Sequence, residues 1–253
     1  MAGDGITYVG HATVLLELGG ARLLTDPVLR SGFGHVRRRV PAVDRSALGD
    51  LDAVLISHLH HDHLDVRSLR MLGARGPVVV PRGAGAFVAR ASGAEVVELE
   101  AGGTLRLGDV TITATRADHR GGRFGRRLRA DPLGYVAGGP RRVYFAGDTG
   151  LFAGMADLAR PPLDVALVPV WGWGPSLGAG HLDPASAARA LTLLRPRIAV
   201  PIHWGTFYPV GLDRVRGAPL TDPPRRFARL AAEHAPEVEV RVLAPGERLD
   251  LLS

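Results

Sequence analysis

The feature that most constrains this chain is a run of metal-binding side chains directly behind an apolar segment. In "VLISHLHHDHLD", residues 54–65, four histidines and two aspartates fall within eight residues. Side chains alternate along an extended segment, so we expect His58 and His60 to point the same way. Asp62 and His63 follow where the chain turns, and they can approach the same place from another angle. Such a cluster can supply part of two metal sites, each of which needs about three protein ligands.

Three later polar residues can complete the set, because each follows an apolar run of strand length. His119 comes after "VTITATRAD", Asp148 after "RRVYFAG" and His203 after "RIAVP". Binding residues are often carried by loops at the ends of a rigid scaffold. A single loop histidine is often only a surface residue, and Asp is favoured in turns such as "GDTG". The argument for His119 and Asp148 therefore depends on their order in the chain.

The composition limits the ligand types and the class of protein. Cysteine is absent, so any metal must be held by nitrogen and oxygen atoms, and thiolate zinc fingers are excluded. The 253 residues, 46% hydrophobic and 22% charged, suit a globular protein, and we expect one catalytic domain over residues 1–253. The net charge is +6, and every basic residue among the 31 counted as Lys or Arg is an arginine. It favours anionic partners, although a solvated surface explains it equally well.

The order of predicted elements indicates an α/β protein with two sheets. Apolar runs of strand length recur throughout, "LDAVLIS" among them as a strand buried on both faces, and "VEVRVLAPG" as the closing strand. Helices are predicted over residues 83–90 and in "DVRSLRML" and "DPASAARALTLL", with Asp65 and Asp183 as N-caps, and in "PPRRFARLAAEHA". An arginine-rich loop is expected around residues 37–39. Two sheets face to face with helices outside would bury every apolar face, which is a four-layer αββα sandwich.

Five ordered motifs carry a resemblance to a known family. "SHLHHDH" is similar to the His-x-His-x-Asp-His signature of the metallo-β-lactamase superfamily. "GHATVLLELGGARLLTDPVL", "FAGDTG", "GHLDPASAARAL" and "PIHWGTF" resemble the branch that contains N-acyl-phosphatidylethanolamine-hydrolysing phospholipase D and, more distantly, L-ascorbate-6-phosphate lactonases. The resemblance covers residues 8–207. It implies the metallo-β-lactamase fold with a dinuclear metal site between the sheets.

The resemblance also implies a role for each candidate residue. The first metal would be bound by His58, His60 and His119, the second by Asp62, His63 and His203, and Asp148 would bridge both. His181, in "GHLDP", matches a histidine near the metals and would orient the substrate or protonate the leaving group. Asp62, Asp148 and His181 are therefore the expected catalytic residues. Zinc suits these ligands best, and manganese or iron suits them as well.

Several other residues could have either a functional or a purely structural role. We expect Asp26 to fix the tautomer of a metal ligand, whereas the role of His11 stays open. His61 should point away from the metals, and His35 and His234 should lie on the surface. Trp171 and Trp173 either wall the pocket or simply pack. The arginines expected near the mouth of the site are at positions 37–39, 120, 123, 126, 127 and 129. The "GPSLG" match to a serine-hydrolase elbow lacks the required strand-to-helix context.

The chemistry that follows is hydrolysis by water activated between two divalent cations. The expected substrate is a small anionic phosphodiester, as for a phospholipase D. The alternatives are a phosphorylated lactone and, ranked lower because no RNA-binding arm is evident, a nucleic acid handled as in ribonuclease Z. A non-catalytic metal scaffold is the least favoured reading. No signal peptide or span-length apolar run is evident, so we expect a cytoplasmic protein, and no amphipathic helix supports peripheral membrane contact. The oligomeric state stays open.

Overall fold

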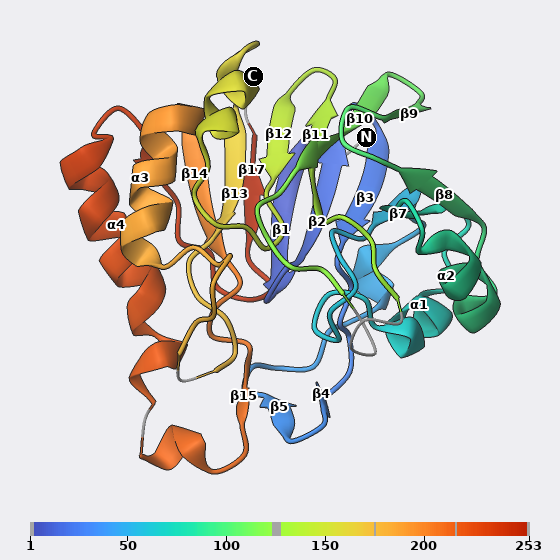
Figure 1. Ribbon diagram of the computed structural model, residues 1–253, viewed down its shortest axis with the longest axis horizontal. Coiled ribbons are helices and arrows are strands. Elements are labelled where there is room, and N and C mark those ends of the chain that lie inside the picture. Colours follow the sequence, from blue (N-terminus) through green and yellow to red (C-terminus); the bar gives the residue numbers. More distant parts are fainter. Residues whose placement is uncertain (1–2, 123–127, 175, 216, 252–253) are drawn as a thin grey trace.

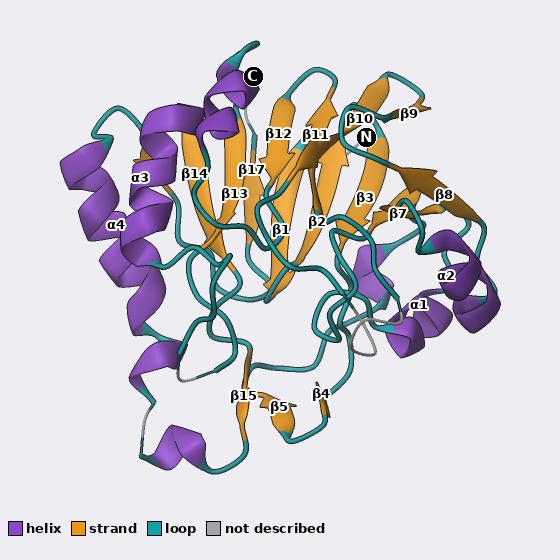
Figure 2. Ribbon diagram, viewed as in Figure 1, coloured by secondary structure: helices purple, strands orange, loops and turns teal. Residues whose placement is uncertain are grey.

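Two seven-stranded sheets form the centre of the computed structural model, which describes residues 3–122, 128–174, 176–215 and 217–251 (Figures 1 and 2). The first sheet has the spatial order β17 (Arg248–Asp250), β1 (Gly5–Gly10), β2 (Thr13–Leu18), β3 (Ala21–Thr25), β6 (Ala53–Leu55), β7 (Val78–Pro81) and β8 (Val96–Leu99). The second has the order β16 (Glu239–Val240), β14 (Ile198–Ile202), β13 (Val165–Pro169), β12 (Arg142–Phe145), β11 (Leu133–Gly138), β10 (Val110–Arg116) and β9 (Thr104–Leu107).

Helices cover the outer face of each sheet. The first sheet carries α1 (Val66–Leu72) and α2 (Gly85–Ser92), and the second carries α3 (Pro184–Leu194) and α4 (Asp222–His234), on opposite flanks of the molecule in Figure 1. Short 3-10 helices occur at Ser46–Leu48, Ala153–Ala159, Leu212–Arg214 and Ala218–Leu220. None of the helices described is long and apolar enough to span a bilayer.

Three buried apolar clusters hold these layers together. The central one combines residues of both sheets, such as Leu16 and Leu167. A second lies between the first sheet and its helices, with Val54 and Val88. A third lies between the second sheet and its helices, with Leu191 and Phe227. Three apolar interfaces require four layers, so the predicted αββα sandwich is confirmed.

Parallel strands bring the candidate residues to one edge. In the first sheet β3, β6 and β7 are parallel, and in the second β12, β13 and β14 are parallel. All three residues of β6 are buried, as expected for a strand covered on both faces. The carboxyl ends of such strands meet at one edge of their sheet, where the loops after β6, β12 and β14 carry the predicted site residues (lower side of Figure 1).

Two sequence predictions about local structure are wrong, and the bounds of a third are shifted. Arg37 and Arg38 do not lie in a loop, because β5 (Val36–Arg38) pairs between β4 (Gly32–Phe33) and β15 (Phe207–Pro209) in a small third sheet. The closing strand is not residues 238–246. Only Glu239–Val240 pairs there, and the last strand is β17, which returns to the first sheet beside β1. The helix predicted over 83–90 is Gly85–Ser92, with Ala84 as a cap without a side-chain hydrogen bond.

The two helix caps predicted from the sequence are present. Asp65 caps α1, and its side chain accepts a hydrogen bond from the Ser68 amide. Asp183 forms a full capping box with Ser186, with Pro184 in the first turn of α3. These caps satisfy amide groups that would otherwise lack partners at the helix start.

We expect Asp183→Ala to lower the free energy of unfolding by about 1 kcal/mol, because the substitution leaves the first-turn amide of Ser186 without its acceptor. Urea denaturation of the purified protein measures this change. Thr221→Ala is the control, since Thr221 is the N-cap of α4 but makes no capping hydrogen bond. Equal losses in the two variants would contradict the assignment.

Candidate metal centre

All seven candidate ligands predicted from the sequence meet at the edge between the two sheets. One group of side chains consists of His58, His60, His119 and Asp148, and a second of His11, Asp62, His63 and His203. Within each group the candidate ligand atoms lie within 4.8 Å of one another. The convergence is a property of the fold, whereas the role of each residue as a ligand stays a prediction.

In the first group, three imidazoles face a common point. Nδ1 of His60 lies 2.9 Å from Nε2 of His58 and 3.2 Å from Nε2 of His119. Oδ2 of Asp148 lies 3.8 Å from Nε2 of His58. His58 is fully buried, whereas His60 and His119 are half-buried and reach the group from two different loops.

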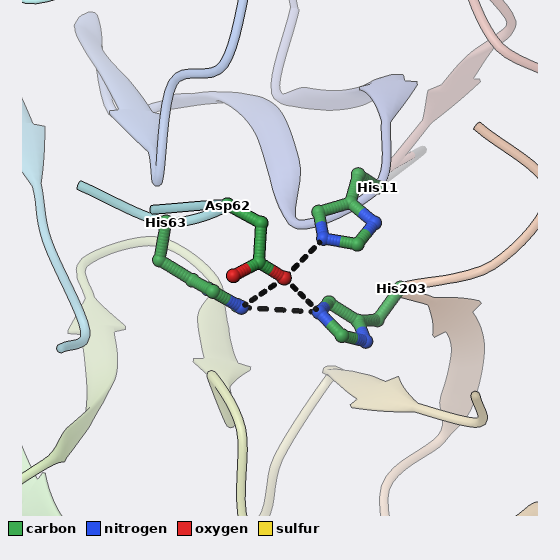
Figure 3. A group of neighbouring side chains, drawn as sticks. All are labelled: His11, Asp62, His63 and His203. Carbon is green, nitrogen blue, oxygen red and sulfur yellow. Dashed lines mark hydrogen bonds and ion pairs between the residues drawn. The ribbon is translucent and has the colours of Figure 1, made fainter. Parts of the chain in front are cut away.

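In the second group, a carboxylate stands between two imidazoles (Figure 3). Nε2 of His63 and Nε2 of His203 are 3.0 Å apart, and both lie close to Oδ2 of Asp62, at 3.6 and 3.5 Å. His11 approaches the same oxygen from the other side, at 3.0 Å. All four side chains are buried.

Asp148 lies between the two groups. Its Oδ2 is 3.2 Å from Nε2 of His63, in addition to the contact with His58, and its Oδ1 is 3.3 Å from Nε2 of His203. Among the described residues, this buried Oδ1 has no hydrogen-bond partner. A buried carboxylate oxygen without a donor is costly unless a cation lies next to it.

Hydrogen bonds fix the tautomers of the histidines. Nδ1 of His119 donates to the Gly180 carbonyl at 2.8 Å, and Nδ1 of His203 donates to the Trp171 carbonyl at 2.7 Å. A carbonyl can only accept, so each of these rings carries its proton on Nδ1 and turns the Nε2 lone pair toward the cluster.

Asp26 fixes the tautomer of His63 in the same way, as predicted from the sequence. Its Oδ2 accepts from Nδ1 of His63 at 2.7 Å and from the Ser57 hydroxyl at 2.5 Å, and its Oδ1 accepts from the Ser57 amide at 2.7 Å. Because the Ser57 hydroxyl donates to Asp26, it accepts from Nδ1 of His58, which is 3.0 Å away. His58 and His63 therefore also turn Nε2 inward.

This arrangement fits divalent cations. Two imidazole nitrogens 3.0 Å apart need a shared proton or a shared cation between them, and a divalent cation can supply that attraction to several ligands at once. Metal–nitrogen bonds of 2.0–2.1 Å in tetrahedral geometry place ligand atoms about 3.3 Å apart, close to the separations in both groups. Imidazole and carboxylate are also the ligands that zinc, manganese and iron accept.

The electrostatics separate His58 and His119, whose rings stay neutral, from His63, whose ring keeps a second proton until a cation replaces it. Burial lowers the pKa of His58 well below its usual value and that of His119 to about 4, which keeps both rings neutral. Burial raises the pKa of Asp62 and Asp148, but the surrounding histidines lower it further, so both stay charged. For His63 burial lowers the pKa, but Asp148, Asp62 and Asp26 outweigh it and hold the pKa high. A cation would displace that proton.

Backbone strain concentrates at this centre. Four described non-glycine residues have positive φ, and three of them are His11 (59°), Asp26 (33°) and His203 (63°). Such conformations cost of order 1–3 kcal/mol and persist where the surroundings enforce them. The strain marks the positions at which the fold holds side chains in place.

A cavity of about 1160 Å³ opens over the centre. His60, Asp62, Asp148, His181 and His203 are among the residues that line it. The lining also contains the apolar side chains of Phe33, Val36, Trp173 and Leu177 and the arginines Arg30, Arg67 and Arg70, of which Arg30 is paired with Asp65.

The lining of the cavity shows where the tryptophans and histidines with uncertain roles lie. Trp173 lines it, whereas Trp171 does not and instead donates to the Gly174 carbonyl. His35 and His61 are exposed, as His234 is, but both line the cavity. His61 belongs to neither metal-binding group.

Of the arginines predicted near the mouth of the site, those that the structure describes do not line the cavity. Arg37, Arg38, Arg39, Arg120 and Arg129 are not among the residues that line the cavity. The guanidinium carbon of Arg38 lies over the Phe207 ring, 4.9 Å from the ring centroid. Arg123, Arg126 and Arg127 lie outside the described residues. The sequence did not predict that Arg30, Arg67 and Arg70 line the cavity, because no pattern in the neighbouring residues distinguishes them from ordinary surface arginines.

His181 lies where the cavity meets the centre. Its Nδ1 donates to the Gly178 carbonyl at 3.1 Å, and its Nε2 is 3.4 Å from Oδ2 of Asp148. The contact with Asp148 raises the pKa of His181. The "GPSLG" segment, whose Pro175 lies outside the described residues, belongs to the loop between β13 and α3, so it does not form a strand-to-helix elbow.

Comparisons with known proteins agree with this geometry. The model of the β-lactamase superfamily domain matches residues 21–204. An uncharacterized protein of Mycobacterium tuberculosis is 34% identical over 97% of this chain and 68% of its own length. A UPF0173 metal-dependent hydrolase of Methanopyrus kandleri is 34% identical over 96% of this chain and 97% of its own length.

The solved structure of Igni18, a metallo hydrolase from Ignicoccus hospitalis, is also similar. It superposes with a TM-score of 0.73 at 26% identity, and 98% of each chain is covered. The family match, the similarity to metal-dependent hydrolases and the buried His/Asp centre agree with one another. The chain belongs to the β-lactamase superfamily and is a metal-dependent hydrolase of the metallo-β-lactamase fold.

Proposed function

We propose that this hydrolase uses two divalent cations to cleave a small anionic phosphodiester. The observation that carries the two-cation part is the position of Asp148, whose carboxylate contacts His58 on one side and His63 and His203 on the other. One carboxylate shared between two groups of ligand atoms suits a pair of neighbouring ions.

The first ion would be held by His58, His60 and His119, and the second by Asp62, His63 and His203, with Asp148 shared. When bound, the ions lower the pKa of water and polarise the bond to be cleaved. Zinc is the ion we propose, and manganese or iron satisfies the same ligands.

Substrate orientation and proton donation would be carried out by side chains of the protein. His181 lies beside Asp148 and lines the cavity, so it can orient the substrate or, when doubly protonated, give its Nε2 proton to the leaving group. Gly178 holds the other ring nitrogen and so fixes the direction of Nε2.

The cavity wall supports an anionic substrate with an apolar substituent. Arg67 and Arg70 are exposed and line the cavity, and Arg70 also donates from Nε to the Ala91 carbonyl at 2.7 Å. Phe33 and Trp173 pack edge to face, with ring centroids 5.9 Å apart, and both are only partly buried. A phosphodiester with an apolar group would match both surfaces, and the motifs shared with the phospholipase D branch favour that ester class.

We expect zinc-reconstituted protein to contain two ions per chain and His60→Ala to contain one, because His60 belongs only to the first group. Elemental analysis after gel filtration measures the content. Chelation should abolish hydrolysis and lower Tm, and zinc should restore both, because bound ions stabilise the folded state. His234→Ala, at an exposed site, is the control. Two tightly bound ions in His60→Ala would contradict the ligand assignment.

His181→Ala should lower kcat by about 10²–10⁴-fold while the protein keeps both ions, because the side chain acts on the substrate and not on the metals. Turnover and metal content are measured on the same preparation. His61→Ala is the matched control, since His61 also lines the cavity but belongs to neither group. Parallel loss of turnover and metal would assign His181 a structural role.

A substrate screen tests the ester class. We expect hydrolysis of bis(p-nitrophenyl) phosphate to exceed that of a panel of phosphorylated and neutral lactones. Arg67→Ala should raise KM for the anionic diester several-fold and leave a neutral ester unchanged, whereas Arg75→Ala, outside the cavity, should change neither. Preferential lactone hydrolysis would replace the phosphodiesterase proposal by a lactonase, and preferential cleavage of RNA would indicate a ribonuclease.

A further inference from the structure

We propose that His11 is a positioning residue that holds the Asp62 carboxylate in place for the second cation and is not itself a metal ligand. The inference rests on the two-cation site proposed above. It concerns a residue in the turn between β1 and β2, far in sequence from the histidine cluster.

The first argument is the hydrogen bond to Asp62. Nε2 of His11 lies 3.0 Å from Oδ2 of Asp62, and both residues are buried. In the part of the chain that the structure describes, Nδ1 of His11 has no partner. A proton on Nδ1 would therefore be buried without an acceptor, whereas a proton on Nε2 has one. His11 is the donor and Asp62 the acceptor.

This tautomer is the opposite of the one found in the other buried rings. His63 and His203 donate from Nδ1 and turn Nε2 inward, where it can bind a cation. If His11 bound a metal through Nε2, its lone pair would face the carboxylate and its Nδ1–H would have no acceptor. Proximity to the second group therefore does not make His11 a ligand.

The hydrogen bond leaves Asp62 able to bind a cation. Oδ2 accepts from His11 on one side and faces Nε2 of His63 and of His203 on the other, at 3.6 and 3.5 Å. A carboxylate oxygen has two lone-pair directions, so one can accept the N–H while the other points toward a cation. His11 thus fixes the direction in which the oxygen presents its remaining lone pair (Figure 3).

The backbone of His11 holds the donor itself in place. Its φ of 59° is left-handed, its amide donates to the Thr206 hydroxyl at 2.7 Å, and its carbonyl accepts from the His203 amide at 2.7 Å. Its ring centroid lies 3.9 Å from that of His203. One residue therefore ties the β1–β2 turn to Asp62 through its side chain and to His203 through its main chain, and both are second-group residues.

The first test uses the wild-type protein loaded with zinc and labelled with ¹⁵N in its histidines. Long-range ¹⁵N–¹H correlation spectra report which ring nitrogen carries a proton. We expect His11 to have a protonated Nε2 and an unprotonated Nδ1, unlike His63 and His203. An unprotonated Nε2 at His11 would overturn the proposal, and because no substitution is involved, folding does not affect the result.

The second test compares His11→Gln with His11→Met, two unbranched side chains of similar length. Gln keeps an N–H donor near the position of Nε2, and Met does not. Competition with a chromophoric chelator should show that Met weakens the second zinc ion 10–100-fold and leaves the first unchanged, whereas Gln stays within a few-fold of wild type. Equal weakening in both variants, or none in Met, would overturn the proposal.

A third comparison tests whether His11 affects the second ion through Asp62 or through another group. In an Asp62→Ala background, His11→Met should cause no further loss of second-ion affinity, because the carboxylate it orients is gone. An additional loss would show that His11 acts through another group and contradict the proposal. If wild-type protein bound only one ion, the two-cation proposal would fail, and that result is distinct from any outcome in the His11 variants.

Discussion

The metal centre depends on imidazoles that turn their Nε2 atoms toward one another. Four rings donate Nδ1 to oxygen atoms of the surrounding protein, so their Nε2 atoms converge beside two charged carboxylates. Ring nitrogens and negative charges gathered this closely in a low-dielectric interior need a shared positive charge to stabilise them. The raised pKa of His63 and the ligand types of both groups express that requirement, and divalent cations would meet it.

The fold supplies that rigidity through strand ends. Side chains after β6, β10, β12 and β14 enter one space because their strands belong to two sheets that pack face to face. The main-chain hydrogen bonds of these sheets fix the loop starts, and Asp26, at the end of β3, links the first sheet to His63. The positive φ at Asp26 and His203 shows that the backbone accepts local strain to keep these directions.

The parts of this picture that sequence could predict are those with local signals. The cluster of residues 58–63, the caps at Asp65 and Asp183 and the buried strand before His58 are all visible in short windows, and the later candidates follow from their order after apolar runs. The missed features depend on distant partners. β5 pairs with the nearby β4, but its other partner is distant, since Tyr208 lies opposite Arg37 across a long stretch of chain. The lining role of Arg67 and the tautomer of His11 depend on neighbours in space that no local pattern contains.

The pairing of β1 with β17 has a consequence for how the molecule is made. Gly5 lies opposite Asp250, and the Tyr8 amide and carbonyl bond to Glu247 and Gly246. During synthesis one side of β1 stays open until β17 has been made, and contacts so distant along the chain form slowly. Since His11 directly follows β1, this part of the metal site is secured only after that pairing. Until then the nascent protein carries an uncovered strand edge that is open to pairing with other chains.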